Sequence, residues 1–95
     1  MAQAPLTNDE ITEALRGLDG WAVMDDKLTR KYKFKDFREA IGFLVRVAFE
    51  AEQMDHHPEV YNVYNNVTLA LTTHDVEGKV TQKDVDLASR INDLA

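Results

Sequence analysis

The spacing of apolar residues, together with three helix-start motifs, predicts three helices along the chain. The motifs are TNDE from Thr7, DFRE from Asp36 and TQKD from Thr81, each with a capping side chain followed three residues later by an acidic residue. Apolar residues follow each motif at helical spacing. The first helix is expected to end between residues 17 and 20, where two glycines lie, and the second near Met54, ahead of a proline.

Alternation of apolar and polar residues predicts two pairs of strands between these helices. The strands are expected at residues 21–24, 28–34, 60–64 and 67–74, with turns at Asp25-Asp26 and Asn65-Asn66. The order is therefore helix, strand, strand, helix, strand, strand, helix (αββαββα). Two such hairpins form a four-stranded antiparallel sheet packed by helices, which is an α+β fold. The length fits a single domain over residues 1–95.

The second helix is apolar around more of its circumference than one sheet can cover. Its apolar residues between Ala40 and Met54 spread over roughly 240° of the helical wheel, whereas a helix on one sheet needs an arc a little over about 100° wide. A short chain also gains buried surface by association. We therefore expect a homodimer or homotetramer that uses this helix and a sheet edge, with Phe43, Val47 and Met54 buried between subunits.

Composition narrows the class of protein without assigning a function. The chain has no cysteine, which excludes disulfides, thiol nucleophiles and cysteine-ligated metals. Its net charge of −6 argues against nucleic acid as a partner, and we interpret the basic residues between Lys27 and Arg38 as a solvated strand face. The N-terminal sequence lacks the basic and apolar regions of a signal peptide, and no apolar run is long enough to cross a membrane. We expect a soluble cytoplasmic protein.

All three histidines fall in a short window, two in the segment Asp55-His56-His57-Pro58 and the third at His74. The predicted hairpin between them folds this segment back toward His74, so the three imidazoles are expected at one open end of the hairpin. Adjacent residues on an extended chain point in opposite directions, and zinc motifs space their ligands by two or more residues, so we expect no metal site. Two alternatives remain: ordinary polar surface residues, or acid–base groups that exchange protons near neutral pH.

Two carboxylates, Glu52 and Asp84, each allow a structural and a functional interpretation. Glu52 falls inside the apolar arc of the second helix, one turn before His56, where an unpaired carboxylate is unfavourable. It either lines a pocket or bends out to water at a fraying helix end. Asp84 is the third residue of the helix that Thr81 caps, so we interpret it first as a helix cap and second as a site residue.

The stretch AEQMDHHPEVYNVYNNVTLALTTHD, with the preceding FKDFREAIGFLVRVAFEAE, resembles the pterin-4a-carbinolamine dehydratases. This family is also known as the dimerisation cofactor of a homeodomain transcription factor. The resemblance runs from about Gly20-Trp21 to Asn92. The elements that carry it are Glu52, His56, His57, Pro58, Tyr64, His74 and Asp84. Two features depart from the animal members: Val60 stands where they carry tryptophan, and the link before the third helix is one residue longer.

The resemblance implies an enzyme that dehydrates 4a-hydroxytetrahydrobiopterin to quinonoid dihydrobiopterin, in tetrahydrobiopterin recycling, with no metal and no redox cofactor. It implies that His56 and His74 are the acid–base groups and that His57 binds and orients the substrate. The implied substrate-binding residues are Glu52, Pro58, Thr72, Thr73 and Asp75. It also implies a functional link to an aromatic amino acid hydroxylase. The alternative is a protein-binding dimerisation cofactor or transcriptional coactivator that acts through the second helix.

Overall fold

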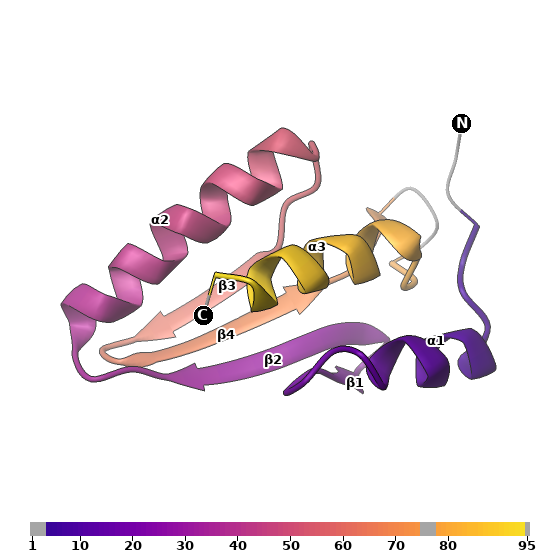
Figure 1. Ribbon diagram of the computed structural model, residues 1–95, viewed down its shortest axis with the longest axis horizontal. Coiled ribbons are helices and arrows are strands. Elements are labelled where there is room, and N and C mark those ends of the chain that lie inside the picture. The colour runs from indigo at the N-terminus through magenta and orange to yellow at the C-terminus, as the bar shows by residue number, and fades with distance from the viewer. Residues whose placement is uncertain (1–3, 75–77, 95) are drawn as a thin grey trace.

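The computed structural model describes residues 4–74 and 78–94, and its elements follow the predicted order αββαββα (Figure 1). The helices are α1 (Asn8–Leu15), α2 (Phe37–Gln53) and α3 (Gln82–Asn92). The strands are β1 (Ala22–Met24), β2 (Lys27–Lys33), β3 (Glu59–Val63) and β4 (Asn66–Leu71). Each helix begins at its predicted cap, because Thr7, Asp36 and Thr81 accept hydrogen bonds from backbone N–H groups of the first turn. The predicted α+β fold is confirmed.

The four strands form one antiparallel sheet in the order β1-β2-β4-β3. The two hairpins are therefore joined by pairing between β2 and β4, and β1 and β3 form the edges. The first hairpin turns at Asp25-Asp26, as predicted. Both residues have positive φ, 53° and 62°, which is the backbone geometry of a tight two-residue hairpin loop.

The second hairpin turns at Tyr64-Asn65, one residue earlier than the predicted Asn65-Asn66. Val63 pairs with Asn66, which is therefore the first residue of β4. The shift comes from a contact outside the hairpin. The Asn65 carbonyl accepts a hydrogen bond from the Phe34 N–H at 2.8 Å, and the Asn65 side-chain amide donates to the Phe34 carbonyl at 2.9 Å. These bonds hold Asn65 against the end of β2, so that Tyr64 is the turn residue with a positive φ, 52°.

The hydrophobic core lies between one face of the sheet and the helices. Alternate strand residues point toward this face and are buried, as the sequence pattern predicts: Leu28, Val67, Leu69 and Leu71. The apolar helix residues buried against them are Ala40, Phe43, Val47 and Ala51 from α2 and Leu87, Ala88 and Ile91 from α3. Ile11 and Leu15 of α1 pack at the margin of the same core. The other face of the sheet therefore carries the residues of opposite parity, such as Lys31, Lys33 and Tyr61.

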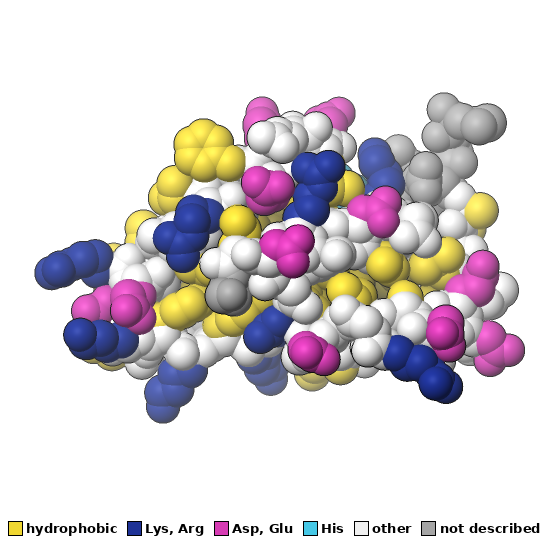
Figure 2. Space-filling view, viewed as in Figure 1, with side chains coloured by type: hydrophobic (Ala, Val, Ile, Leu, Met, Phe, Trp, Pro, Cys, Tyr) yellow, Lys and Arg dark blue, Asp and Glu magenta, His cyan; other side chains and the backbone are white. Residues whose placement is uncertain are grey.

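The orientation of α2 differs from the predicted one. Phe43 and Val47 are buried in the chain's own core, and Met54 packs against it, so the prediction that these three lie between subunits is wrong. The sheet covers one apolar stripe of α2 and leaves a second stripe of large apolar residues exposed: Phe37, Ile41, Val45 and Phe49. Figure 2 shows hydrophobic side chains uncovered along the outer side of this helix. None of the described helices is both long and apolar enough to cross a membrane.

Candidate active site

The C-terminal end of α2 determines where His56 points. Asp55 adopts a positive φ of 49°, a conformation that usually favours glycine. Its N–H donates to the Glu52 carbonyl at 3.1 Å, and the His56 N–H donates to the Ala51 carbonyl at 3.1 Å. This pair of bonds is the Schellman arrangement that ends a helix and reverses the chain. It turns the backbone inward directly after α2, so that His56 is buried beneath the end of the helix.

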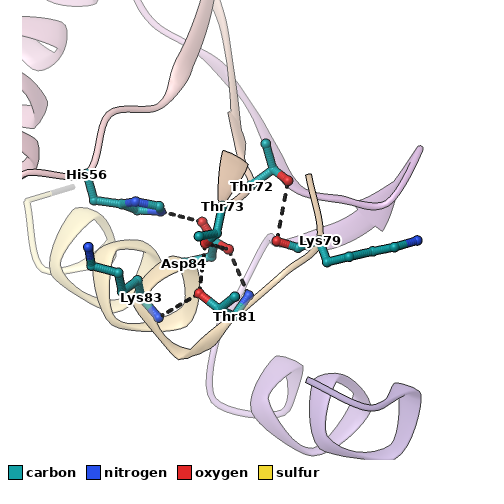
Figure 3. A network of polar contacts seen from close by, with 7 residues as sticks. All are labelled: His56, Thr72, Thr73, Lys79, Thr81, Lys83 and Asp84. Atoms are coloured by element: carbon teal, nitrogen blue, oxygen red, sulfur yellow. Dashed lines mark hydrogen bonds and ion pairs between the residues drawn. The ribbon is translucent and has the colours of Figure 1, made fainter. Parts of the chain in front are cut away.

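His56 pairs with a buried carboxylate from the first turn of α3 (Figure 3). Its Nε2 lies 2.5 Å from Asp84 Oδ1, and Asp84 is fully buried. The other oxygen, Oδ2, accepts hydrogen bonds from the Thr81 backbone N–H at 2.8 Å and from the Thr73 hydroxyl at 2.9 Å. Asp84 is therefore the predicted helix cap and, at the same time, the partner of His56.

The Asp84 environment defines how the His56 ring is oriented. A carboxylate away from water needs hydrogen-bond donors, and Asp84 has three of them around its two oxygens. An ionised carboxylate only accepts hydrogen bonds, so the His56 Nε2 presents its hydrogen to Asp84. Nδ1 is then the ring nitrogen left for a different partner. A buried carboxylate that fixes the tautomer and orientation of an imidazole is an arrangement that enzymes use in acid–base catalysis.

His57 points away from His56, as expected for adjacent residues on an extended segment. Its Nε2 lies 2.8 Å from Glu52 Oε1, and both side chains are largely exposed. Glu52 thus reaches toward water at the end of α2, and its partner there is His57. An exposed pair of this kind adds little to stability. The two neighbouring histidines therefore have different environments, one buried against Asp84 and one exposed beside Glu52.

The three histidines line a single cavity of about 350 Å³ at the open end of the second hairpin. The cavity, which we call the histidine cavity, is lined by Asp55, His56, His57, Pro58, Glu59, Thr72, Thr73, His74 and Lys83. It brings together six predicted site residues: His56, His57, His74, Pro58, Thr72 and Thr73. Glu52 is outside this lining, and the predicted Asp75 is outside the described residues.

Hydrogen bonds to the Lys79 carbonyl position Thr72 and Thr73, the two threonines that line this cavity after β4. The Thr73 N–H donates to the Lys79 carbonyl at 2.9 Å, and the Thr72 hydroxyl lies 3.4 Å from the same carbonyl. Thr72 and Thr73 are buried, whereas His74 is exposed at the rim. Within residues 4–74 and 78–94, no group of three or more His, Asp or Glu side chains is arranged to hold a metal ion.

Comparison with known proteins places this site in a family. A model of the family described as pterin 4 alpha carbinolamine dehydratase matches residues 4–94. The chain belongs to this family. The resemblance that the histidine segment suggests is thereby confirmed, and it extends across nearly the whole chain.

Individual relatives are similar in both sequence and structure. A protein of Opitutus terrae, provisionally named a pterin-4-alpha-carbinolamine dehydratase, is 52% identical over 90 residues, which cover 95% of this chain and 93% of the relative. A Brucella ovis protein with the same provisional name is 47% identical over 97 residues, 100% of this chain and 99% of the relative. A crystal structure of a transcriptional coactivator/pterin dehydratase from Brucella melitensis superposes with a TM-score of 0.91 at 47% identity, covering 97% of this chain and 99% of the other.

The cavity of this family member also contains charged residues that sequence reasoning did not select. Lys83, in the first turn of α3, brings a positive charge to the lining, and Asp55 and Glu59 bring negative charges. Lys83 immediately precedes Asp84 in sequence, so the interpretation of Asp84 as a site residue could have indicated it. Asp55 has a backbone role that only the structure reveals, because its positive φ ends α2.

Proposed function

We propose that this chain dehydrates 4a-hydroxytetrahydrobiopterin to quinonoid dihydrobiopterin, in tetrahydrobiopterin recycling, by histidine acid–base catalysis. The observation that carries the proposal is the convergence of His56, His57 and His74 on one cavity, with His56 oriented by a buried carboxylate. Family membership supplies the substrate class, since relatives across nearly the full chain are named as pterin-4-alpha-carbinolamine dehydratases.

The reaction needs two proton transfers. The C4a–O bond breaks as the leaving hydroxyl takes up a proton and departs as water. The N5 lone pair forms the new double bond to C4a, and N5 then loses its proton to a base. The elimination of water neither adds electrons to the substrate nor removes them, so the reaction requires no redox cofactor. A general acid and a general base placed at one cavity are sufficient, and each typically contributes about 10²- to 10⁴-fold in rate.

His56 and His74 are the residues that we assign to these transfers. His56 lies at the inner side of the cavity with its ring fixed by Asp84, whose negative charge stabilises the imidazolium that forms when the ring accepts a proton. His74 lies at the exposed rim, where it can exchange protons with water. Because His56 precedes β3 and His74 follows β4, the two imidazoles reach the cavity from different strands at the open end of the hairpin, and each can serve one face of a flat pterin at C4a.

His57 is assigned to binding and orientation. Its contact with Glu52 holds the exposed imidazole at the mouth of the histidine cavity. Pro58 limits the backbone of the same segment. The Thr72 and Thr73 hydroxyls donate to the Lys79 carbonyl and to Asp84, so their oxygens are left to accept hydrogen bonds from N–H groups of the pterin ring. Lys83 adds a cation that suits the carbonyl oxygen of the pterin ring.

The test is stopped-flow dehydration of chemically generated 4a-hydroxytetrahydropterin, followed by absorbance as the quinonoid product forms. We expect the purified chain to accelerate dehydration well above the uncatalysed rate, and the rate to be unchanged by a metal chelator. A rate equal to that of buffer alone would contradict the proposed function. Activity that chelator abolishes and zinc restores would contradict the metal-free mechanism.

A second candidate function, protein binding through α2, has one observation in its favour. The stripe of Phe37, Ile41, Val45 and Phe49 is exposed on the side of α2 opposite the sheet. The solved structure from Brucella melitensis is that of a transcriptional coactivator/pterin dehydratase, so both functions are attached to a related chain. We propose that this stripe forms the contact between copies of the chain, and that any other protein partner would compete for it.

A further inference from the structure

A groove separate from the histidine cavity lies where the amino-terminal segment and α1 meet the first hairpin (Figure 1). It has a volume of about 890 Å³, which is within the range of small-molecule sites. None of the described residues lines both this groove and the histidine cavity. Its apolar walls are formed by Leu6, Ile11, Leu15, Val23 and Val80. We call it the α1 groove, and any ligand that it holds is bound outside the site of the proposed reaction.

Two opposite charges stand in this apolar lining. Lys79 Nζ lies 3.7 Å from Asp26 Oδ2, and the two side chains are 50% and 74% exposed. An exposed pair of this kind contributes little to stability, so exchanging it for contacts with a ligand costs little. The α1 groove therefore offers a cation and an anion side by side at the edge of an apolar wall.

We infer that the α1 groove binds a free α-amino acid with a large apolar side chain. The carboxylate of the amino acid pairs with the Lys79 ammonium, and its ammonium pairs with the Asp26 carboxylate. Both groups of the amino acid are bonded to one carbon, so they can face two protein charges that lie 3.7 Å apart. The inference does not rest on the proposed function, because it uses none of the residues assigned to dehydration.

The side chain of the amino acid covers apolar surface that the chain itself leaves open. Val23 pairs with Leu28 and so stands on the helix-covered face of the sheet, yet it is 40% exposed. Ile11 and Leu15 of α1 are only partly buried beside it. Each methylene that these residues remove from water contributes a factor of about four in binding.

The charges of the groove disfavour other classes of ligand. Asp26 repels an anion such as a nucleotide, and Lys79 repels a simple amine. An uncharged apolar molecule would take water away from the ion pair without replacing its hydrogen bonds. A residue inside a peptide has neither a free ammonium nor a free carboxylate on its α-carbon. A free amino acid supplies both charges and the apolar tail.

The Lys79 side chain can be altered without altering the histidine cavity. Figure 3 shows this side chain extending away from Thr73 and Asp84, while the Lys79 carbonyl accepts a hydrogen bond from the Thr73 N–H at 2.9 Å. That contact is made by the backbone alone. Lys79→Met therefore removes the charge from the α1 groove and keeps the backbone contact beside the histidines.

The test is a titration of the isotope-labelled full chain with L-leucine, followed by NMR at the backbone amides of Val23, Lys79 and Val80. We expect saturable shifts with a dissociation constant of about 1 mM, as suits a ligand of this size. Glycine, which has the charges without the tail, should bind at least about tenfold more weakly. N-acetyl-L-leucinamide, which has the tail without the charges, should also bind at least about tenfold more weakly.

Two variants separate the proposed contact from a general effect of charge. Lys79→Met should weaken L-leucine binding by about tenfold, because a hydrogen bond to a charged group is lost. Lys27→Met is the matched control, because Lys27 follows Asp26 in the chain but pairs with Glu59 and lies outside the groove lining. It should bind L-leucine as the wild type does, and the dispersion of each spectrum reports that the variant is folded.

Several results would overturn the inference. The absence of saturable shifts at the three amides would show that L-leucine does not bind in the α1 groove. Equal affinity for N-acetyl-L-leucinamide would show that the groove takes the apolar side chain of a peptide instead of a free amino acid. An equal loss in Lys79→Met and Lys27→Met, or no loss in Lys79→Met, would contradict the contact with Lys79.

Discussion

Replacing Asp84 with asparagine should separate the orientation of His56 from its mere presence. The change preserves the shape of the side chain but turns one carboxylate oxygen into an NH₂ group. The remaining oxygen is expected to stay with the Thr81 N–H and the Thr73 hydroxyl, which both bond to Oδ2. The NH₂ group then faces His56 Nε2, which must accept a hydrogen bond and give up its hydrogen to Nδ1.

The magnitude follows from the bonds that change. A hydrogen bond to a charged group contributes about 1.5–3 kcal/mol, so Asp84→Asn should lower the free energy of unfolding by about 2 kcal/mol. In a domain of this size that corresponds to roughly 8–16 °C in Tm. The rate should fall further than the stability suggests, by about 10²- to 10⁴-fold in kcat, because the wrong ring nitrogen carries the proton.

The assay pairs urea denaturation with stopped-flow kinetics on Asp84→Asn and on Thr81→Ala. Thr81→Ala removes the capping hydroxyl but leaves the bond between His56 and Asp84, so it should cost about 1 kcal/mol and keep kcat near the wild-type value. A full kcat in Asp84→Asn, or an equal loss in both variants, would refute the assignment of Asp84 as the residue that orients His56.

Two further changes test the surface of α2 and the core. The Phe49 side chain is 67% exposed, so Phe49→Asp should leave the fold intact and dissociate the oligomer that we propose. Light scattering should then give the mass of a monomer, and an unchanged mass would exclude Phe49 from the contact. Tyr32→Phe should leave stability unchanged or raise it by about 1 kcal/mol at neutral pH, because the buried Tyr32 hydroxyl has no hydrogen-bond partner within the described residues. Burial raises the pKa of Tyr32 above its usual 10.0, and the nearby Arg30 charge opposes this effect in part. The wild-type chain should therefore lose stability as the pH rises above about 10, and Tyr32→Phe should lose less. Urea denaturation across this pH range would contradict the account if the stability of both proteins changed equally with pH.

The parts of the fold that depend only on residues close together in the sequence were predictable from the sequence. The three helix starts follow from local caps, and the buried strand residues Val67, Leu69 and Leu71 follow from alternation with period two. The orientation of α2 was not predictable in this way, because two apolar stripes lie on one helix and the pattern does not say which stripe faces the sheet. The turn at Tyr64-Asn65 likewise depends on Phe34, which lies in a different hairpin.

The same distinction applies to the candidate site. The hairpin argument placed His56, His57 and His74 together because antiparallel pairing is a local consequence of one turn. The bond between His56 and Asp84 spans 28 residues and requires α3 to pack beneath the end of α2. The sequence therefore indicated the capping role of Asp84 first and a site role second, but not its pairing with His56. Glu52 was left between a pocket and water, and in the structure its side chain is largely exposed with His57 as its partner.

The central claim is that His56 and His74 share the proton transfers, each on one face of the substrate. The direct measurement is dehydration of the two separated 4a isomers by His56→Ala, His74→Ala and the double variant, with His57→Ala measured alongside as the control for a histidine assigned to binding. Each single variant should lose chiefly one isomer's turnover, by about 10²- to 10⁴-fold, and the double variant should be slow with both isomers. Full activity of the double variant toward both isomers would contradict the account.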